Sequence, residues 1–286
     1  MGKKENEKEE VEIIKMDGSR EIFDPNKLRH SLEKAGAGSE TIEAVVSKIE
    51  SEIEDGMTTG TIYKRAYEIL ERKESTAAAR YSLRRALVDL GPTGFPFEEF
   101  VGEIFRAKGF DVKVGVMVEG ECVEHEVDML AENETSEISM EIKFHNSQKI
   151  RSDLKVALYV KSRFEDILSR QQKDGNGKKK EGWLLTNTKF TKNALDYAEC
   201  VGLKIVSWSY PEKGNLQDLV EETGLHPLTC LTSLPDKEKT LLVEQGTVLC
   251  RDLKNNTKLL EELGFKEEKI NKIKDEASKL CTPYSK

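Results

Sequence analysis

Cysteine is scarce in this sequence, and long apolar stretches are missing. Its five cysteines lie far apart, include no C-x-x-C pair and are odd in number, which favours reduced thiols and argues against a structural zinc site. No window approaches about eighteen consecutive apolar residues and no signal peptide opens the chain, so we expect a cytoplasmic protein without a membrane span. The sequence also has no excess of basic residues. With 45 Lys and Arg against 53 Asp and Glu, the net charge is -8, so any polyanion must bind a local patch.

The 286 residues are enough for several domains that each bury a core of their own. Glycine and proline concentrate at residues 91–96, and a second break in composition follows an apolar run at residues 211–215. These breaks predict three domains, at residues 11–90, 95–210 and 216–286.

The first domain is predicted to be a β-hairpin packed on a helical bundle. Apolar residues on both sides of the pair Asp17-Gly18 indicate two short strands joined by a tight turn. The pair Asp24-Pro25 is typical of a helix start, and apolar residues then recur at helical spacing through three stretches.

The segment IIKMDGSREIFDPNKLRHSLEKAG resembles the start of an ATP-cone, the nucleotide-binding regulatory domain at the front of ribonucleotide reductases and of their repressor. The resemblance extends to residue 90. It implies that ATP or dATP binds this domain, with Lys15 and Lys27 facing the phosphates as point charges and Glu21 near the sugar or in a bridging position. The alternative is a helical accessory domain whose nucleotide site has decayed.

The second domain is predicted to contain a mixed sheet flanked by helices, in the order αβββαβαβ. A strand meander comes first, and parallel strands joined by crossover helices follow it. The expected elements are a helix that ends at Gly109, strands at 112–118, 123–130 and 138–144, a helix at 150–171, a strand at 182–187, a helix at 192–200 and a strand at 204–209. The stretch 173–180 is expected to be an exposed loop.

Three polar residues interrupt the expected strands. Glu141 and Lys143 are two residues apart, so their side chains project from one face of a strand. If the two neighbouring strands pair through the turn between them, Asp128 lies beside Glu141. Two adjacent carboxylates repel each other unless a cation lies between them, and Mg²⁺ (or Mn²⁺) is the expected ion.

Such a site suits hydrolysis of a phosphodiester. The metal polarises the phosphate and lowers the pKa of a bound water, while Lys143 orients that water or stabilises the developing charge. The alternative is a surface ion pair, because E-x-K on an exposed strand face is common.

The order of these motifs resembles the PD-(D/E)xK nuclease superfamily, and within it the Mrr-like restriction endonucleases. FEEFVGEIFRAKGF is similar to their opening helix, and VEHEVD and MEIKFHN follow in the family's order. The resemblance implies that Asp128, Glu141 and Lys143 are catalytic, that the two carboxylates bind the metal, and that Glu98 is an additional acidic residue. Glu98 is preferred to Glu99 because its spacing places it on the apolar stripe of the helix.

Other polar residues are weaker candidates for contacts with the substrate. His145 shares the strand face of Glu141 by parity, whereas His125 is expected to face away from Asp128. The stretch 151–167 of the helix after the site carries four basic residues, which indicate either contacts with a DNA backbone or an ordinary solvated face; these are Arg151, Lys155, Lys161 and Arg163. The lysines at 178–180 are a further candidate for phosphate contacts.

The third domain is predicted to be helical, with short helices separated by glycine turns. The stretch LPDKEKTLLVEQGTVLCRDLKNN resembles a helix-hairpin-helix module, which offers backbone N–H groups to a DNA phosphate. A helical cap for oligomerisation or for contact between domains is the other interpretation.

Together these features predict a cytoplasmic, Mg²⁺-dependent DNA endonuclease of restriction or repair, regulated by ATP or dATP. Cleavage of a duplex needs two active sites, so a homodimer or a larger homo-oligomer is expected. One rival is a nucleotide-responsive DNA-binding regulator without nuclease activity. The other is a structural DNA-binding protein that keeps a nuclease fold but has lost its activity.

Overall fold

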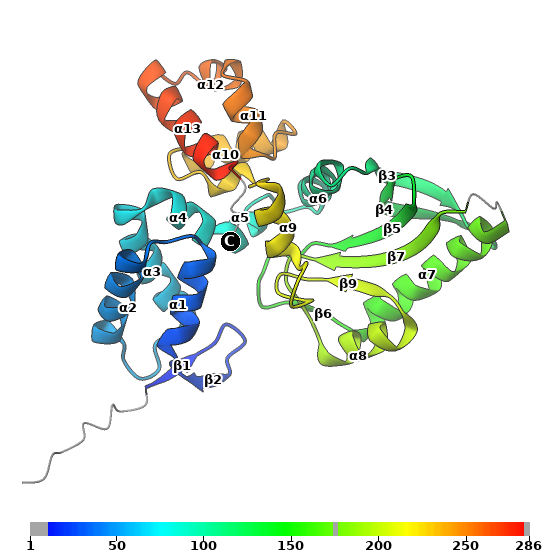
Figure 1. Ribbon diagram of the computed structural model, residues 1–286, viewed down its shortest axis with the longest axis horizontal. Coiled ribbons are helices and arrows are strands. Elements are labelled where there is room, and N and C mark those ends of the chain that lie inside the picture. The colour runs from blue at the N-terminus through cyan, green and yellow to red at the C-terminus, as the bar shows by residue number, and fades with distance from the viewer. Residues whose placement is uncertain (1–10, 174–176, 283–286) are drawn as a thin grey trace, which may run out of the picture. The chain divides into compact units, whose positions relative to one another are not determined.

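The computed structural model describes residues 11–173 and 177–282 and divides into two compact units. The first unit ends at Ser82 and the second begins at Leu83. The fold is mixed α/β, as predicted, with a hairpin and helices in the first unit and a mixed sheet followed by helices in the second (Figure 1). Within the described residues, no helix combines the length and the apolar character that crossing a membrane requires.

The first unit is a two-stranded hairpin with four helices. Strands β1 (Glu12–Ile14) and β2 (Arg20–Ile22) are antiparallel, and the turn between them uses Gly18 at a φ of 83°. The helices are α1 (Pro25–Lys34), α2 (Ser39–Glu52), α3 (Thr59–Lys73) and α4 (Ser75–Tyr81). The predicted helix start is confirmed, because the side chain of Asp24 accepts a hydrogen bond from the amide of Asn26 at 2.9 Å.

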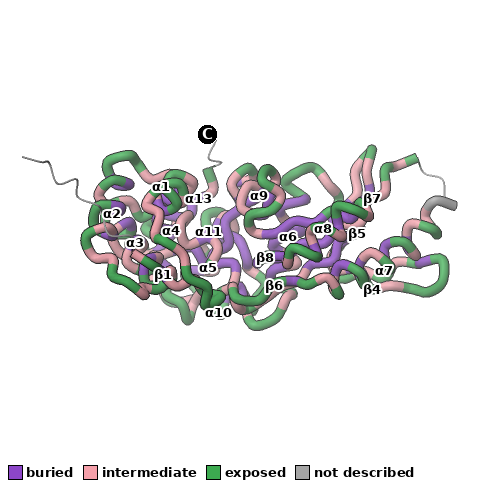
Figure 2. The backbone as a smooth tube through the Cα atoms, turned by 90° about the horizontal axis from the view of Figure 1, so that it is seen from below, coloured by how far each residue is buried: buried purple, intermediate pink, exposed green. Residues whose placement is uncertain are grey.

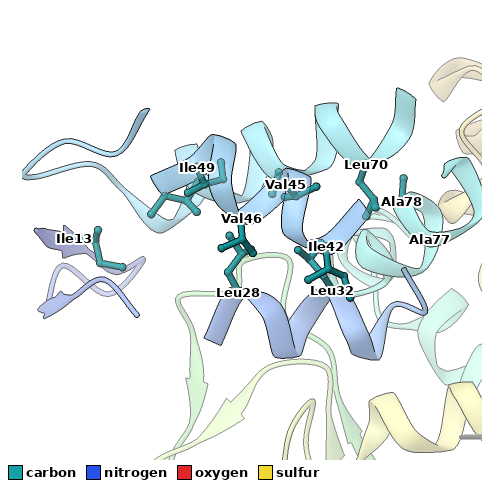
Figure 3. Close-up of a cluster of buried hydrophobic side chains, with 12 residues drawn as sticks. Ile13, Leu28, Leu32, Ile42, Val45, Val46, Ile49, Leu70, Ala77 and Ala78 are labelled. Carbon is teal, nitrogen blue, oxygen red and sulfur yellow. The ribbon is translucent and has the colours of Figure 1, made fainter. Parts of the chain in front are cut away.

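One apolar cluster holds the first unit together. Figure 3 shows Leu28 and Leu32 of α1 turned toward the buried side chains of α2, with Leu70 of α3 and the alanines of α4 beside them. Small residues in α4 let this short helix approach α3 closely. Helix α4 was not predicted from the sequence, because its run of alanines has no apolar periodicity of its own.

The second unit contains a five-stranded sheet in the order β3-β4-β5-β7-β9. Strands β3, β4 and β5 form an antiparallel meander, and β7 and β9 continue the sheet in parallel. These strands are β3 (Asp111–Glu119), β4 (Glu124–Glu132), β5 (Ser136–Lys143), β7 (Lys179–Thr186) and β9 (Lys204–Val206). The predicted meander with crossover connections is therefore confirmed.

Helices cover both sides of this sheet. Helix α6 (Phe95–Ala107) lies on one side, and α7 (Leu154–Lys173) and α8 (Lys192–Val201) lie on the other (Figure 1). Side chains of α7 and α8 form a buried cluster with Leu184 of β7. Figure 2 shows β5 as a largely buried segment, which is expected of a strand with a neighbour on each side.

Three boundaries differ from the predicted ones by more than two residues. Helix α7 begins at Leu154 and not at Ile150, because β6 (Arg151–Ser152) pairs with β8 (Lys189–Phe190) in a small parallel sheet. Strand β7 begins at Lys179, inside the stretch that was expected to be a loop; residues 174–176 of that stretch lie outside the described part. Strand β9 ends at Val206 and not at Ser209.

The second unit begins with α5 (Leu83–Val88) and ends in a group of short helices. Glycines with positive φ, Gly224, Gly246 and Gly264, follow three of them, as the glycine turns in the sequence predicted. The elements are α9 (Leu216–Thr223), a 3-10 turn η1 (Leu228–Cys230), α10 (Asp236–Glu244), α11 (Cys250–Asn255), α12 (Lys258–Glu262) and α13 (Glu267–Leu280). The buried carboxylate of Glu276, in α13, accepts hydrogen bonds from Thr232 and Ser233. These bonds hold the segment that leads into α10.

Candidate functional site

Asp128 and Glu141 come together where β4 and β5 separate. The ladder between these strands runs from Glu132 back to Met129. At the next residue, Oδ2 of Asp128 accepts a hydrogen bond from the amide of Ile142 at 2.7 Å. The carboxylate of Asp128 is thereby fixed against the strand segment that carries Glu141.

Two cations neutralise Glu141, which is only 3% exposed. Lys143, two residues along β5, pairs with one carboxylate oxygen, and Arg163 of α7 pairs with the other. Arg163 also donates to the backbone carbonyl of Glu126 at 3.0 Å, and the ring of Tyr159 lies 4.5 Å from its guanidinium carbon. A buried carboxylate needs such partners, because an unpaired charge out of water is costly.

The structure gives Arg163 a different place from the one considered in the sequence. Its guanidinium points into the site, so it belongs to the surroundings of Glu141 and not to a solvated basic face. Arg151 lies in β6 and not in the helix at all. The predicted basic face of that helix is therefore reduced to Lys155 and Lys161 among the four named residues.

Glu98 lies in the first turn of α6, where the charges of Asp128 and Glu141 act on its carboxyl group. Burial, together with the negative charges of Asp128 and Glu141, raises the pKa of Glu98 to about 7. Oε1 of Glu98 lies so close to Gly94 that a Cβ there would be 3.0 Å away. Glu99 lies instead within 3.8 Å of Arg106. The structure thus brings together Glu98, Asp128, Glu141 and Lys143, which are 45 residues apart at the extremes.

The two histidines lie in different surroundings. Nε2 of His145 is 3.0 Å from the hydroxyl of Ser152, and burial together with Lys143 lowers its pKa. The side chain of Asn187 holds the backbone of His145 through two hydrogen bonds, of 2.9 and 2.8 Å. Nε2 of His125 contacts Asp166 of α7 at 2.8 Å. Sequence reasoning missed Ser152, Asn187 and the role of Arg163, because they come from other elements and no spacing links them to E-x-K.

The donor set fits a hard cation. Asp128 and Glu141 offer only oxygens, and Mg²⁺ binds proteins through one or two carboxylates and completes its shell with water and phosphate oxygens. Within the described residues, no group of three or more His, Cys, Asp and Glu side chains is placed to hold a metal ion. A site for Mg²⁺ or Mn²⁺ would therefore depend on Asp128 and Glu141, with the remaining ligands supplied by solvent and substrate.

A second set of predicted residues meets in the first unit. Lys15 and Lys27 both pair with Oε2 of Glu21, at 2.6 and 3.0 Å, and these contacts lower the pKa of that carboxyl. Glu21 and Lys27 line a cavity of about 160 Å³ together with Tyr63 and Tyr81. The rings of these two tyrosines stack with their centroids 5.0 Å apart. Burial raises the pKa of Tyr81 to about 12, so its hydroxyl stays protonated.

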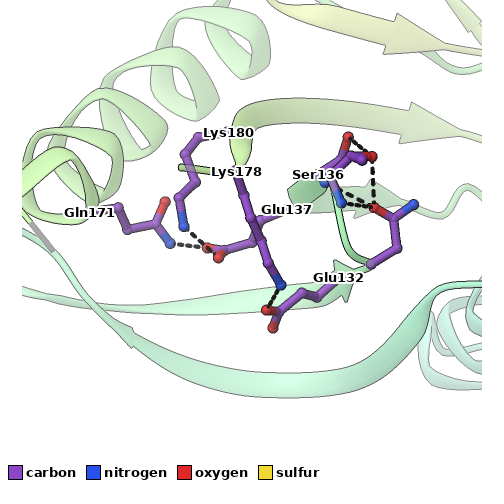
Figure 4. A network of polar contacts seen from close by, with 8 residues as sticks. Glu132, Ser136, Glu137, Gln171, Lys178 and Lys180 are labelled. Carbon is purple, nitrogen blue, oxygen red and sulfur yellow. Dashed lines mark hydrogen bonds and ion pairs between the residues drawn. The ribbon is translucent and has the colours of Figure 1, made fainter. Parts of the chain in front are cut away.

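The lysines at the start of β7 are engaged in ion pairs. Figure 4 shows Lys178 reaching Glu132, and Lys180 reaching Glu137, where Gln171 of α7 also donates. Lys180 lies 2.5 Å from Glu137. These contacts tie the start of β7 to the meander, which is a structural use of the lysines.

In the stretch that resembles a helix-hairpin-helix, backbone amides between the two helices donate hydrogen bonds to carbonyls of the chain itself. The amides of Gly246 and Thr247 cap the end of α10 through bonds to Val243 and Leu242, both of 2.9 Å. The amide of Cys250, at the start of α11, donates to the carbonyl of His226. Phosphate binding by this stretch stays a prediction.

Known protein families match two separate stretches of the chain. Residues 11–90 match the ATP cone domain family, which supports nucleotide binding, and residues 226–281 match the family described as AF1548-like, C-terminal. An uncharacterized protein of Archaeoglobus fulgidus is 38% identical over 182 residues, which cover 63% of this chain and 99% of that protein. The crystal structure of a protein of unknown function, AF1548, matches with a TM-score of 0.52 and 36% identity, over 66% of this chain and 98% of that one.

None of these descriptions assigns an enzymatic activity. The sequence identity and the coverage of the matches show the family of the chain. The chain belongs to the AF1548-like family, and it carries an ATP-cone domain at residues 11–90.

Proposed function

We propose that the chain is a metal-dependent DNA endonuclease of the PD-(D/E)xK superfamily, Mrr-like, acting in restriction or repair and regulated by ATP or dATP. The observation that carries the proposal is the hydrogen bond from the amide of Ile142 to Asp128, which brings that carboxylate to Glu141 and Lys143. Carboxylates that can hold a metal ion, with an ammonium group beside them, suit metal-dependent hydrolysis of a phosphodiester.

Each residue has a separate task in this proposal. Asp128 and Glu141 would hold Mg²⁺, and the ion would polarise the phosphate and lower the pKa of a bound water. Lys143 donates to the attacking water or to the phosphate oxygens as charge develops there. Arg163 holds the carboxylate of Glu141 in place through its second oxygen. Glu98 is the additional acidic residue beside these carboxylates, and burial together with the charges of Asp128 and Glu141 raises its pKa.

The first unit supplies the proposed regulation. Lys15 and Lys27 would pair with the phosphates of ATP or dATP, and Glu21, which now bridges the two lysines, would move toward the sugar. The stacked Tyr63 and Tyr81 offer an aromatic wall to the base. Because a duplex has two strands to cut, we further propose that the chain acts as a homodimer or a larger homo-oligomer.

Cleavage of supercoiled plasmid tests the proposal. Wild type with Mg²⁺ is expected to nick or linearise the plasmid, whereas Asp128→Asn and Lys143→Gln are expected to be slower by about 100-fold or more. The matched controls Asp111→Asn and Lys113→Gln change the same residue types at exposed positions of β3 and should keep the wild-type rate. Equal rates for Asp128→Asn and Asp111→Asn would contradict the proposed site.

A nucleotide-responsive DNA-binding regulator without nuclease activity is the second candidate. The favouring observation is that both oxygens of Glu141 already pair with cations of the chain, so the site is neutralised by its own residues. This function predicts no cleavage of any DNA, together with an affinity for DNA that changes when ATP or dATP is added. Fluorescence anisotropy with a labelled duplex measures that affinity.

A further inference from the structure

An aromatic side chain is exposed on α7 beside the carboxylates of the proposed nuclease site. Tyr159 is 53% exposed, and Arg163 follows it by one helical turn. The guanidinium of Arg163 lies over the ring, with its carbon 4.5 Å from the ring centre. Because the guanidinium covers one face of the ring, the rest of the ring offers a flat apolar surface to the solvent.

The contact with Arg163 fixes the orientation of this ring. Arg163 pairs with Glu141 and donates to the carbonyl of Glu126 at 3.0 Å, so its guanidinium plane is held by two partners. A planar cation held in this way stacks on an aromatic face. The ring is therefore pre-oriented, and a single guanidinium separates it from the carboxylate that is proposed to hold the metal.

A cation lies one turn before the ring on the same side of α7. Lys155 precedes Tyr159 by four residues and is exposed. Among the residues that the structure describes, its ammonium group has no carboxylate partner. Helix α7 thus presents a free cation, an exposed ring and Arg163 in this order, and the order ends at Glu141. Cations that alternate with aromatic rings are typical of surfaces that bind a single strand of nucleic acid.

We propose that Tyr159 stacks on an unpaired base of the DNA beside the phosphate that is cut, while Lys155 contacts the backbone of the same strand. This inference rests on the proposed nuclease function and names its substrate, a strand with unpaired bases near the cut, as in single-stranded, flapped or branched DNA. In a duplex the bases are stacked on each other and only their edges are open in the grooves, so the ring cannot cover a base. Every base has a π-face, so the contact selects no sequence.

Fluorescence anisotropy of the full chain with a labelled single strand tests the proposal, with Ca²⁺ in place of Mg²⁺ so that the strand stays intact. Tyr159→Leu keeps an apolar side chain over Arg163 but removes the aromatic face, so it should weaken binding by at least about fivefold, the loss of one stacked base. Tyr159→Phe keeps the ring and should stay within about twofold of wild type. The matched control is Leu158→Ala, the exposed neighbour on α7, which should also stay within about twofold.

A stacked base and a ring that only shields the pair of Arg163 and Glu141 give different results. A strand that carries a fluorescent adenine analogue, whose emission falls on stacking, should be quenched by wild type and by Tyr159→Phe but not by Tyr159→Leu. A fully paired duplex of the same sequence should bind wild type and Tyr159→Leu equally. Absence of single-strand binding by wild type, an equal loss on single strand and duplex, or full quenching by Tyr159→Leu would each overturn the proposal.

The salt dependence of the same binding tests Lys155. Lys155→Gln should reduce the slope of log affinity against log salt concentration by about 0.7, the value for one phosphate contact on a single strand. Lys192→Gln removes an exposed lysine of α8 and should leave the slope unchanged. An equal slope for wild type and Lys155→Gln would overturn the backbone contact.

These measurements are separate from the plasmid assay, because no strand is cut in Ca²⁺. Plasmid cleavage in Mg²⁺ combined with unchanged single-strand binding by Tyr159→Leu would overturn this inference and leave the nuclease standing. Single-strand binding that depends on Tyr159, without cleavage in Mg²⁺, would support the stacking contact and overturn the nuclease.

Discussion

Glu98 titrates near neutral pH because of where its carboxyl lies. Burial and the charges of Asp128 and Glu141 raise its pKa from 4.5 to about 7. The folded chain therefore holds this proton more tightly than the unfolded chain does. Between pH 4.5 and 7 the folded state binds more protons, so the free energy of unfolding falls as the pH rises through this window.

Glu98→Gln should remove the fall in the free energy of unfolding that occurs as the pH rises. At pH 8 the variant is expected to be more stable than wild type by about 1 kcal/mol, a value reduced from the full pKa shift because Glu98 is only half-buried. At pH 5 the two should be nearly equal. Urea unfolding followed by tryptophan fluorescence measures this, since both tryptophans, Trp183 and Trp208, lie in the second unit. The neighbouring Glu99→Gln is the control, and an equal gain in that variant would contradict the account.

Site residues were predictable from the sequence where they share a strand, lie on strands joined by a short turn, or match a motif. Glu141 and Lys143 were expected on one face of a strand, and their contact follows from that spacing. Arg163 was not expected beside Glu141, because it lies one helix later and several basic residues of that stretch were equally suitable. Only the packing of α7 on the sheet selects Arg163 among them.

Among the contacts between helices and strands, Asp166 joins α7 to the turn between β3 and β4. Its carboxylate accepts hydrogen bonds from the amides of Cys122 and Val123, at 2.9 and 3.4 Å, and contacts His125. The contact with His125, followed by those with the turn, lowers the pKa of Asp166 to about 2. The stability that this carboxylate contributes is present above its ordinary pKa near 3.8 and is lost as the pH falls toward 2.

Asp166→Asn should therefore loosen this turn without unfolding the sheet. The amides of Cys122 and Val123 donate to different oxygens of the Asp166 carboxylate, and an asparagine side chain has only one acceptor oxygen. Hydrogen exchange at these two amides is therefore expected to become faster. Exchange within the β5–β7 ladder should stay as in wild type. Asp196→Asn, at an exposed position of α8, serves as the control. Unchanged protection of both turn amides would show that Asp166 does not hold them.

Gly182 sets how closely α7 approaches β7. A methyl group there would meet Cδ2 of Phe164 at 2.4 Å, so Gly182→Ala should lower the free energy of unfolding by about 1 to 3 kcal/mol. Combining it with Phe164→Leu should cost less than the sum of the two single changes, because the smaller side chain leaves room. Urea unfolding of the four chains measures this coupling, and strict additivity would contradict the packing described.

Long elements were predictable and short ones were not. The meander and the crossover helices show clear apolar patterns, and all of them occur within a few residues of the expected positions. Strands β6 and β8 have two residues each, too few for any alternation to be visible. Their pairing nevertheless decides where α7 begins and places Ser152 beside His145.

The chain joins an ATP-cone and an AF1548-like part. The cavity lined by Glu21 and Lys27, proposed as the nucleotide site, predicts a specific loss of affinity. Lys27→Gln removes a cation that lines it, so ATP and dATP should bind about tenfold more weakly. Lys64→Gln, exposed on α3, should bind as wild type does. Calorimetric titration measures both, and equal affinity in the two variants would place the nucleotide elsewhere.

The most direct test of the central claim is the rate at which the full chain nicks supercoiled plasmid in Mg²⁺, compared between wild type and Glu141→Gln. The substitution keeps the shape of the side chain but removes the charge that the proposed metal and Lys143 both need. We expect nicking by wild type, changed in rate by ATP or dATP, and a loss of about 100-fold or more in the variant. Equal nicking by the two proteins, or none by wild type on modified, unmodified or branched DNA, would contradict the account.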